Sequence, residues 1–395
     1  MPRRSLLRFL HDFWATPIRA EPLALFRIAM GTTILLSLLT SVGPNLARYL
    51  GPNGILPGQA MDDWQRRSCR FCLLRGPVNV PLLDDKLPAR VVGVKEDKIE
   101  PSIPFYERSG MLTPERIGAW QEWCEAPEHV YWIFAVLVLA MACMTLGFCT
   151  RVSTIVAWAL FVSFNQRLTW VNNGGDSMMR VGLFYLMFAP SGAVWSLDRL
   201  LWRWWRRGAA PASEPVLIPA WSVRLIQIQL CFVYFFTALS KLGLDWYDGE
   251  AVYWMFNDTS LNRWPYSRLP VPLFLCRLFT WGTLVFEFSF GFFVLFGKRR
   301  RFVLEAAGKS PEAGFRCAIT IPALRPWLLL GGVALHMGIL IHTEVGWFSP
   351  ATVSYYAVFL SGETLDWFVH LRWLRRMRAV DVPNEEPQSA HPVAV

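Results

Sequence analysis

Charged side chains are scarce in this chain. Only 17% of its 395 residues are Asp, Glu, Lys or Arg, whereas soluble globular proteins carry about 25%. Hydrophobic residues make up 53% of the sequence, 20 residues are tryptophan, and the mean hydropathy is +0.30. This composition excludes an ordinary soluble enzyme and predicts an all-α polytopic membrane protein with the lipid bilayer as its partner.

Acidic residues are the scarcer of the two signs of charge, and the formal net charge is +9. A basic excess can indicate a nucleic-acid-binding protein. Here, however, the arginines cluster in short runs beside apolar segments, which is the pattern of topology signals at the cytoplasmic face of a membrane. We therefore expect no nucleic-acid partner.

Two further features are missing. The sequence MPRRSLLRFLHDFW has no long apolar core before Pro17 and no small-residue cleavage site, so residues 1–21 are predicted to be a cytoplasmic lead-in and not a removable signal peptide. Cys69 and Cys72 form a CxxC without a second CxxC or a nearby histidine, so no metal site is expected. In an oxidising compartment a disulfide can join two of Cys69, Cys72 and Cys124, and the spacing does not decide which two.

Apolar segments with flanking charges recur along the chain, and eight can be laid out as membrane-spanning helices. They are 22–42, 128–148, 152–169, 177–197, 221–241, 271–297, 325–342 and 350–371. With both termini cytoplasmic, every short basic cluster falls on the cytoplasmic side, namely Arg151 and the runs 199–207, 298–301 and 372–378.

The same orientation predicts a multi-pass protein of the cell inner membrane. It places the 43–127 loop on the outer face as an ordered cap, and it places Lys241 there as well. The tail, 380–395, is polar and contains proline, so it is predicted to be disordered.

Polar residues inside the apolar segments are the first functional candidates, because a buried charge in a bilayer is costly. Glu287 lies too deep to reach water, so it is protonated, paired with an arginine such as Arg27, or lining a water-filled cavity. Asp176 and Arg180 are four residues apart, so an ion pair between them would support the start of a helix. His336 and His342 lie in the segment 325–342, and a lone buried histidine such as His336 is more often a packing residue than a catalyst.

Lys241 ends the apolar stretch 221–241 and has two interpretations. It can be an anchor whose long stem brings its charge to the headgroups. It can also be a partly desolvated amine that loses its proton and then acts as a base. Asp245, four residues further on, would tend to keep it charged.

Aromatic residues are dense around this stretch. Phe232, Tyr234, Phe235, Phe236 and Trp281 would suit a flat lipid-soluble ring such as a quinone. They would suit lipid chains equally well.

Several motifs, taken in order, resemble the HTTM (horizontally transferred transmembrane) domain family, which includes the membrane part of vitamin K-dependent gamma-glutamyl carboxylase. These motifs are EPLALFRI (21–28), LGFCTRVS (146–153), TWVNNGGDSMM (169–179), VYFFTALSKLGLDWYDG (233–249), EFSFGFFVLFG (287–297) and HMGILIHTEVGWF (336–348). The resemblance implies one HTTM domain over 22–379. It implies that Lys241 is the catalytic base and that His336 corresponds to a histidine of the family's motif. Asp176 takes the place of a histidine that assists the chemistry.

The resemblance implies a quinol-dependent modifying enzyme with carboxylase-like chemistry, of the carbon–carbon lyase or monooxygenase type. A secreted peptide or a partner protein would be the substrate, since no counterpart of the family's large extramembrane domain follows residue 380. The alternative is a non-enzymatic membrane protein on the same scaffold, acting in transport, lipid binding, peptide maturation or immunity.

Overall fold

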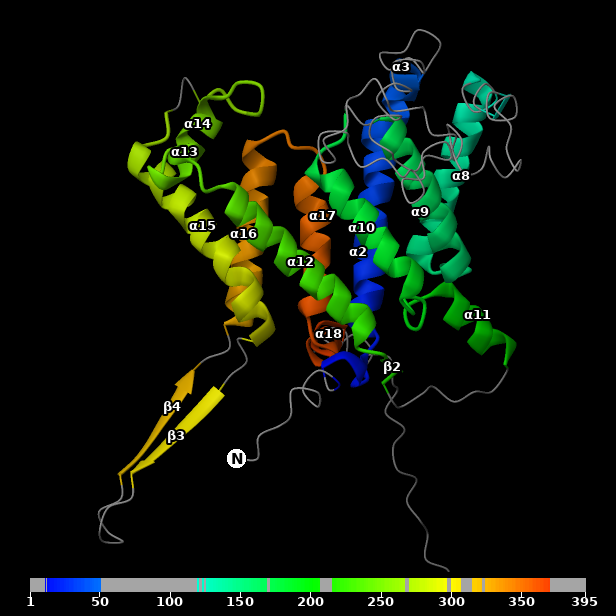
Figure 1. Cartoon of the computed structure of the whole chain (residues 1–395). Coiled ribbons are helices and arrows are strands. Elements are labelled where there is room, and N and C mark those ends of the chain that lie inside the picture. The colour runs from blue at the N-terminus through cyan, green and yellow to red at the C-terminus, as the bar shows by residue number, and fades with distance from the viewer. Residues whose placement is uncertain are drawn as a thin grey trace, which may run out of the picture.

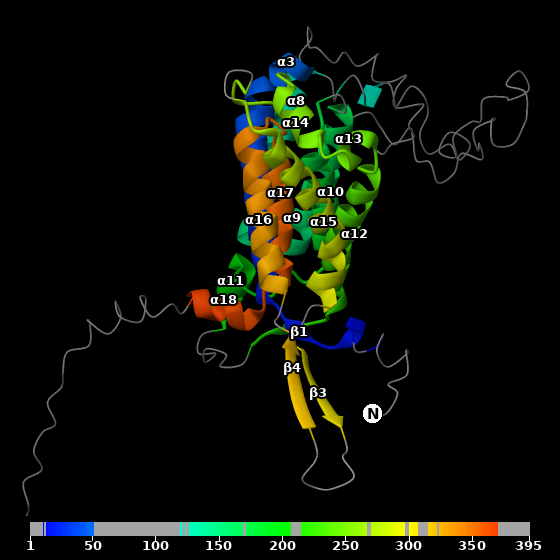
Figure 2. The same ribbon diagram turned by 90° about the vertical axis from the view of Figure 1, so that its left-hand side faces the viewer.

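A computed structural model gives the arrangement of the chain. It describes residues 11, 13–50, 119, 120, 123, 126–168, 171–206, 215–266, 270–296, 300–306, 315–321 and 324–369. Most of this part is helical, and the long helices run side by side in a bundle (Figure 1). Short helices α13 (Leu244–Tyr247) and α14 (Ala251–Asn257) mark one end of the bundle, and a hairpin of β3 (Arg300–Ala306) and β4 (Phe315–Ile321) marks the other (Figure 2).

The first half of the bundle surrounds α2 (Glu21–Ser37), which begins with Pro22 in its first turn and continues through a π-helical turn at Leu38–Val42. Both sides of α2 are buried, because it packs against helices from both halves of the chain. After α2 come the short α3 (Leu46–Leu50) and the longer helices α8 (Pro127–Leu146), α9 (Thr150–Arg167) and α10 (Gly174–Phe188).

The second half consists of α12 (Trp221–Ser240), α15 (Leu273–Phe296), α16 (Arg325–His342) and α17 (Phe348–Ser354), which a 3₁₀ turn at Tyr355–Phe359 extends. Helix α12 packs against α15, α15 against α16, and α16 against α17. At the β3–β4 end lie α11 (Leu197–Trp205), α18 (Gly362–Val369) and the antiparallel pair of β1 (Ile18–Arg19) with β2 (Leu217–Ile218). In the hairpin, Arg300 lies opposite Ile321.

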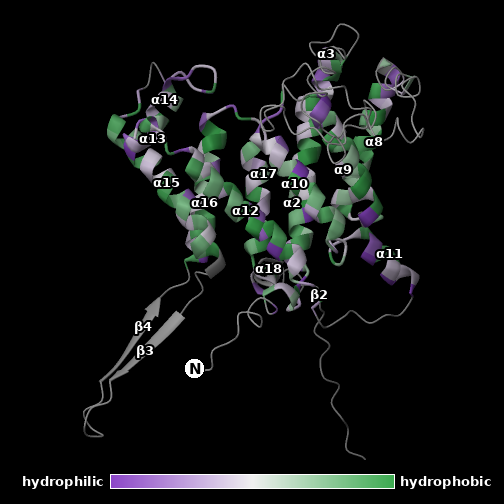
Figure 3. Cartoon of the chain, in the orientation of Figure 1, coloured by the Kyte–Doolittle hydropathy of each residue, from purple (hydrophilic) through white to green (hydrophobic). Residues whose placement is uncertain are grey.

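Large apolar side chains cover much of the outside of the bundle, among them Trp132, Leu139, Val152 and Phe292. Figure 3 shows this apolar colouring along the helices, with more polar residues toward their ends. Among the residues that the structure describes, four helical stretches are long and apolar enough to cross a membrane: Glu21–Leu50, Glu128–Leu146, Trp221–Ser240 and Leu273–Val294. The chain is therefore a helical membrane protein, as its composition predicted.

The predicted apolar segments match the helices well in most places, and two differ. The segment 177–197 stops being helical after Phe188, because Ala189 is extended and the residue before a proline is disfavoured in a helix. The segment 350–371 is not one helix, because Leu360 is extended and the Ser361 hydroxyl accepts a hydrogen bond from Thr364 N–H (3.1 Å) at the start of α18. The count of eight crossings stays a prediction.

Some sequence predictions fall outside the described residues. These are most of the 43–127 loop with Cys69, Cys72 and Cys124, and the tail 380–395.

Candidate functional site

Lys241 lies at the end of α12, where the backbone leaves the helical conformation at the α13–α14 end of the bundle. Its ammonium group turns toward α15 and forms an ion pair with Oε1 of Glu287. The lysine side chain is 24% exposed and the glutamate side chain only 7%. The ring of Trp246 lies 5.1 Å from Nζ, so a cation–π contact holds the amine from a second side.

The partner of Glu287 is thus Lys241 and not Arg27. Of the three alternatives that the sequence leaves open, pairing is correct, but with a lysine from the end of α12. Oε2 of Glu287 is buried and has no hydrogen-bond partner among the described residues. A buried carboxylate oxygen without a donor is costly, so this atom marks a place where a proton or a ligand would be stabilised.

Tyr234 lies seven residues before Lys241, so both side chains project from the same side of α12. Its hydroxyl lies 2.8 Å from Nε2 of His336 on α16 and 2.5 Å from the hydroxyl of Tyr356. All three side chains are buried. At Gly332, one turn before His336, a Cβ atom would lie 2.0 Å from the Tyr356 hydroxyl, so glycine provides the space for this contact.

Aromatic rings enclose these hydrogen bonds. Phe290 and Phe286 lie 4.5 Å and 5.5 Å from Tyr234 between ring centroids, and Phe348 lies 5.5 Å from His336. Hydrogen bonds are electrostatically stronger in such apolar surroundings, and an unpaired polar atom is more costly there. Nδ1 of His336 is such an atom, because it is buried and no described residue bonds to it.

Asp176 lies in the first turn of α10, where it caps the helix. Its Oδ2 accepts a hydrogen bond from Asn173 N–H (2.8 Å), and Asn173 Oδ1 accepts one from Gly175 N–H (2.7 Å). This reciprocal pair is a capping box. A Cβ atom at Gly175 would lie 2.6 Å from the backbone nitrogen of Phe348, so the turn packs directly under the start of α17.

The capped turn that contains Asp176 contacts Phe348 at Gly175, and the ring of Phe348 contacts His336. Within the described part of the chain, no hydrogen bond or ion pair joins Asp176 to Lys241 or His336. The structure brings Lys241 together with Glu287 and brings His336 together with Tyr234 and Tyr356. It places Asp176 in a supporting turn.

The aromatic residues predicted to hold a flat ring do not surround one space. Tyr234 is buried, whereas Phe232, Phe235, Phe236 and Trp281 are between 44% and 61% exposed. Those four side chains face outward from the bundle, where lipid chains would lie. The sequence leaves two uses open for these side chains, a flat ring and lipid chains, and the exposure of the four on α12 and α15 favours contact with lipid chains.

Sequence reasoning missed two groups of this site. Tyr356 was not singled out, and the pairing of Lys241 with Glu287 was not foreseen. One signal was present in the sequence: the four-residue spacing of Gly332 and His336 puts both on one face of α16 and leaves room there for a neighbouring side chain.

Arg27 is the other buried charge of interest, and it is held differently. It lies in α2 with no exposed surface and donates hydrogen bonds to the carbonyl oxygens of Ser191 (2.5 Å) and Trp195. A Cβ atom at Gly147 would lie 3.0 Å from the guanidinium carbon, so glycine is needed beside it.

The site can exchange protons. It contains an amine, a carboxylate with one open oxygen, an imidazole with one open nitrogen and two phenols, all within one region of the bundle. Among the described residues, no group of three or more His, Cys, Asp or Glu side chains could hold a metal ion.

One family model matches this chain, that of the HTTM domain, over residues 119–308. The match includes Asp176, Lys241 and Glu287, and it confirms the family that the sequence motifs predicted. No solved structure matches the chain.

Proposed function

Because the chain carries an HTTM domain, we propose that it is a multi-pass enzyme of the inner membrane whose Lys241–Glu287 pair accepts a proton from a substrate. In this proposal the chain crosses the membrane about eight times and both termini lie in the cytoplasm. The path of the chain supports this topology, because successive helices run alternately between the two ends of the bundle (Figure 1). Arg19, Arg199, Arg300 and Arg325 occur at or near the β3–β4 end, in agreement with a cytoplasmic location of that end.

One observation carries the catalytic proposal: a half-buried lysine is paired with a buried carboxylate that keeps one oxygen open. A lysine that served only as an anchor would extend toward the headgroups, whereas Lys241 turns inward to α15. The amine and the carboxylate are in direct contact, so a proton taken from a substrate by the pair can be shared between them.

The remaining site residues have supporting roles in this proposal. Lys241 is the base and Glu287 its proton-sharing partner. His336 with Tyr234 and Tyr356 forms a hydrogen-bonded group beside the pair, able to orient a substrate hydroxyl or pass a proton. Asp176 keeps Phe348 against His336 and acts as a positioning residue.

The substrate that this chemistry fits is a weakly acidic, lipid-soluble molecule. The family resemblance implies a quinol, whose phenolic hydroxyl would be the proton donor, and a secreted peptide as the molecule to be modified by a carboxylase-like reaction. Support for the quinol comes from the polar groups of the site. The aromatic residues add none, because four of the five that would suit its ring face outward.

A non-enzymatic transport function on the same scaffold is the second candidate. The observation that favours it is again the open oxygen of Glu287, since a buried carboxylate beside a partly exposed lysine can also bind and release an ion or a proton on a pathway.

Replacing Lys241 by arginine tests the catalytic proposal. Arginine keeps the charge and the reach to Glu287, but it cannot lose its proton near neutral pH. We expect Lys241→Arg to fold with the melting temperature of the wild type and to lose roughly 10²- to 10⁴-fold in product formation, or all complementation of a deletion strain.

Lys241→Met is the companion variant, because it removes both the charge and the base. It should also lose function, with a small decrease in melting temperature. Full function in Lys241→Arg would show that Lys241 is an anchor and that the chemistry has no base at this position.

Single cysteines in a cysteine-free background test the topology. Thr259, in the exposed turn after α14, and Glu363, exposed on α18, lie at opposite ends of the bundle. Thr259→Cys should react with a membrane-impermeant maleimide in intact cells, and Glu363→Cys only after lysis. Labelling of position 363 before lysis would reverse the orientation.

A further inference from the structure

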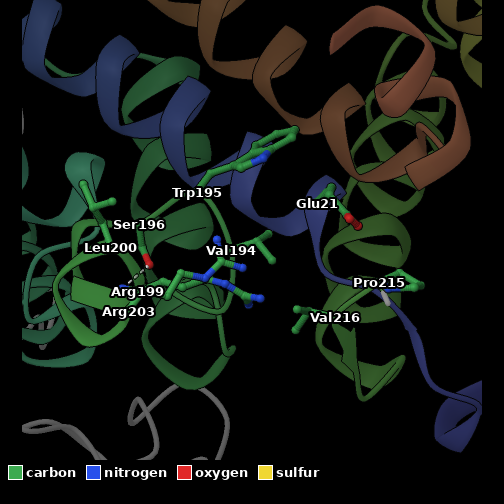
Figure 4. Close-up of a pocket in the computed structure, with 9 residues that line it drawn as sticks. All are labelled: Glu21, Val194, Trp195, Ser196, Arg199, Leu200, Arg203, Pro215 and Val216. Atoms are coloured by element: carbon green, nitrogen blue, oxygen red, sulfur yellow. Dashed lines mark hydrogen bonds between the residues drawn. The ribbon is translucent and has the colours of Figure 1, made fainter. Parts of the chain in front are cut away.

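A pocket of about 350 Å³ opens at the β3–β4 end of the bundle, whereas Lys241 lies at the other end of α12. Its walls come from the start of α2, the turn before α11, α11 itself and the residues just before β2. Figure 4 shows the guanidinium groups of Arg199 and Arg203 directed into the same space, with Val194 and Val216 beside them and Glu21 at its edge.

Helix α11 places both arginines in the pocket because they are four residues apart and share one face of the helix. The helix begins at a cap formed by the Ser196 hydroxyl, which accepts a hydrogen bond from Arg199 N–H (3.2 Å). Asp198 is the only acidic residue of α11, and it points elsewhere. Its carboxylate accepts hydrogen bonds from the backbone N–H groups of Cys149 (2.7 Å) and Thr150 (2.9 Å) at the start of α9.

The positive charge in the pocket is therefore not balanced by a direct partner. Among the residues that the structure describes, no acidic side chain forms an ion pair with Arg199 or Arg203. Glu21 is already bonded to Arg19, at 2.7 Å. Burial lowers the pKa of Arg199 and the neighbouring charge of Arg203 lowers it further, while the Glu21 carboxylate at the pocket edge acts to raise it without outweighing them. Two guanidinium groups in this arrangement suit a phosphate, which arginine binds through paired hydrogen bonds.

The apolar residues of α11 indicate where the pocket lies relative to the membrane. Trp204 and Trp205 are 75% and 82% exposed, and Leu200 and Trp202 are exposed as well. Exposed tryptophans beside arginines on a short helix are typical of a helix that lies in the membrane interface. The pocket would then open at the level of the lipid headgroups on the cytoplasmic side, where anionic lipids attract basic residues.

We propose that this pocket binds the phosphate-bearing headgroup of an anionic phospholipid. Arg199 and Arg203 bind the phosphate, and the acyl chains leave along Val194, Leu200 and Val216. The pocket volume is within the range of small-ligand sites, about 300–1,000 Å³. This site is separate from the Lys241–Glu287 pair and stands whether or not that pair is catalytic.

Native mass spectrometry of the full chain, released from nanodiscs, tests the proposal. The probes are phosphatidylglycerol and phosphatidylcholine in discs of equal size. Arg203→Gln removes one pocket charge without removing the bond that Arg199 donates to the Ala193 carbonyl (2.5 Å). The matched control is Arg206→Gln, which removes the same charge from the residue directly after α11. The Arg206 side chain stacks on Trp202 (4.6 Å) and does not line the pocket.

We expect the wild type to retain phosphatidylglycerol and not phosphatidylcholine. Arg203→Gln should weaken retention roughly tenfold, the loss expected for one charge-assisted hydrogen-bonding group, while Arg206→Gln stays within about twofold. Arg203→Lys keeps the charge but not the paired donors, so its retention of phosphatidylglycerol should lie between those of the wild type and Arg203→Gln.

Three results would overturn the proposal. Equal retention of the two lipids would show no headgroup selection, and equal losses in Arg203→Gln and Arg206→Gln would show general surface attraction. Displacement of phosphatidylglycerol by millimolar inorganic phosphate would assign the pocket to a free anion. As a control for unfolding, the melting temperature of each variant is measured in lipid-free detergent. We expect all of them to equal that of the wild type.

Discussion

Arg27 and Lys241 are both cations taken out of water by the bundle, and the two are stabilised in opposite ways. Arg27 has no exposed surface and donates to two backbone carbonyls, those of Ser191 and Trp195. Lys241 keeps 24% of its side chain exposed and pairs with Glu287. Removing a charge from water is costly in both cases, but only Lys241 is bonded directly to a group that can itself gain or lose a proton.

Under the proposed function, the difference separates a structural charge, Arg27, from a chemical one, Lys241. Backbone carbonyls cannot change their charge, so Arg27 can only fix the turn between α10 and α11. That turn needs fixing, because Trp195 has a positive φ of 50°, an unfavourable conformation for a residue with a side chain. The carboxylate of Glu287 can be protonated, so the state of Lys241 can change during a reaction.

Replacing Arg27 by leucine should have the largest effect on the folded state. The variant leaves two buried carbonyls without donors, at a cost of about 1–3 kcal/mol each. We expect a large decrease in expression and in melting temperature in detergent, with Arg206→Gln as a control that changes neither. If Arg27→Leu melted like the wild type and lost only function, Arg27 would belong with Lys241 and the comparison would fail.

Glu287→Gln should have the opposite effect, a loss of function with little loss of stability. The amide has almost the same shape and can still accept a hydrogen bond from Lys241, so we expect a melting temperature within a few degrees of the wild type. It cannot share a proton, so product formation or complementation should be lost. Wild-type function in Glu287→Gln would make the ion pair structural, and Lys241 would then resemble Arg27.

Much of the bundle is readable from the sequence because membrane-spanning helices are long and continuous. The apolar run that precedes Lys241 corresponds to α12 within one residue, and the segment 325–342 coincides with α16. The family could also be recognised from local motifs, and Lys241 was named from one of them.

The pairing between helices could not be read in the same way. Glu287 and Lys241 are 46 residues apart, and only the rotation of α15 against α12 decides that the carboxylate meets a lysine and not Arg27. The break at Leu360 depends on a local cap at Ser361 that hydrophobicity does not show. Tyr356 lies in the 3₁₀ turn before that break, and it was missed for the same reason.

The smallest expected effect concerns Asp198, a carboxylate near Arg27. Its hydrogen-bond donors are the backbone N–H groups of Cys149 and Thr150 and the Thr150 hydroxyl. Burial acts to raise its pKa, but hydrogen bonds from Thr150 and Cys149 outweigh burial, and the pKa is lowered overall. A lowered pKa means that its stabilising contribution is complete above the unfolded value of about 3.9 and is lost as the pH falls through the folded value.

Asp198→Asn should therefore lower the free energy of unfolding at pH 7 by the amount expected for one lost helix cap, about 0.5–2 kcal/mol, and the melting temperature should decrease accordingly. The gap to the wild type should stay constant from pH 7 to pH 5 and shrink below pH of about 4, where the wild-type carboxylate becomes protonated. Melting curves of both proteins at these pH values measure it. A gap that changed between pH 7 and pH 5 would mean that Asp198 shares protons near neutrality, and the distinction between a fixed charge near Arg27 and a titratable one at Glu287 would then be wrong.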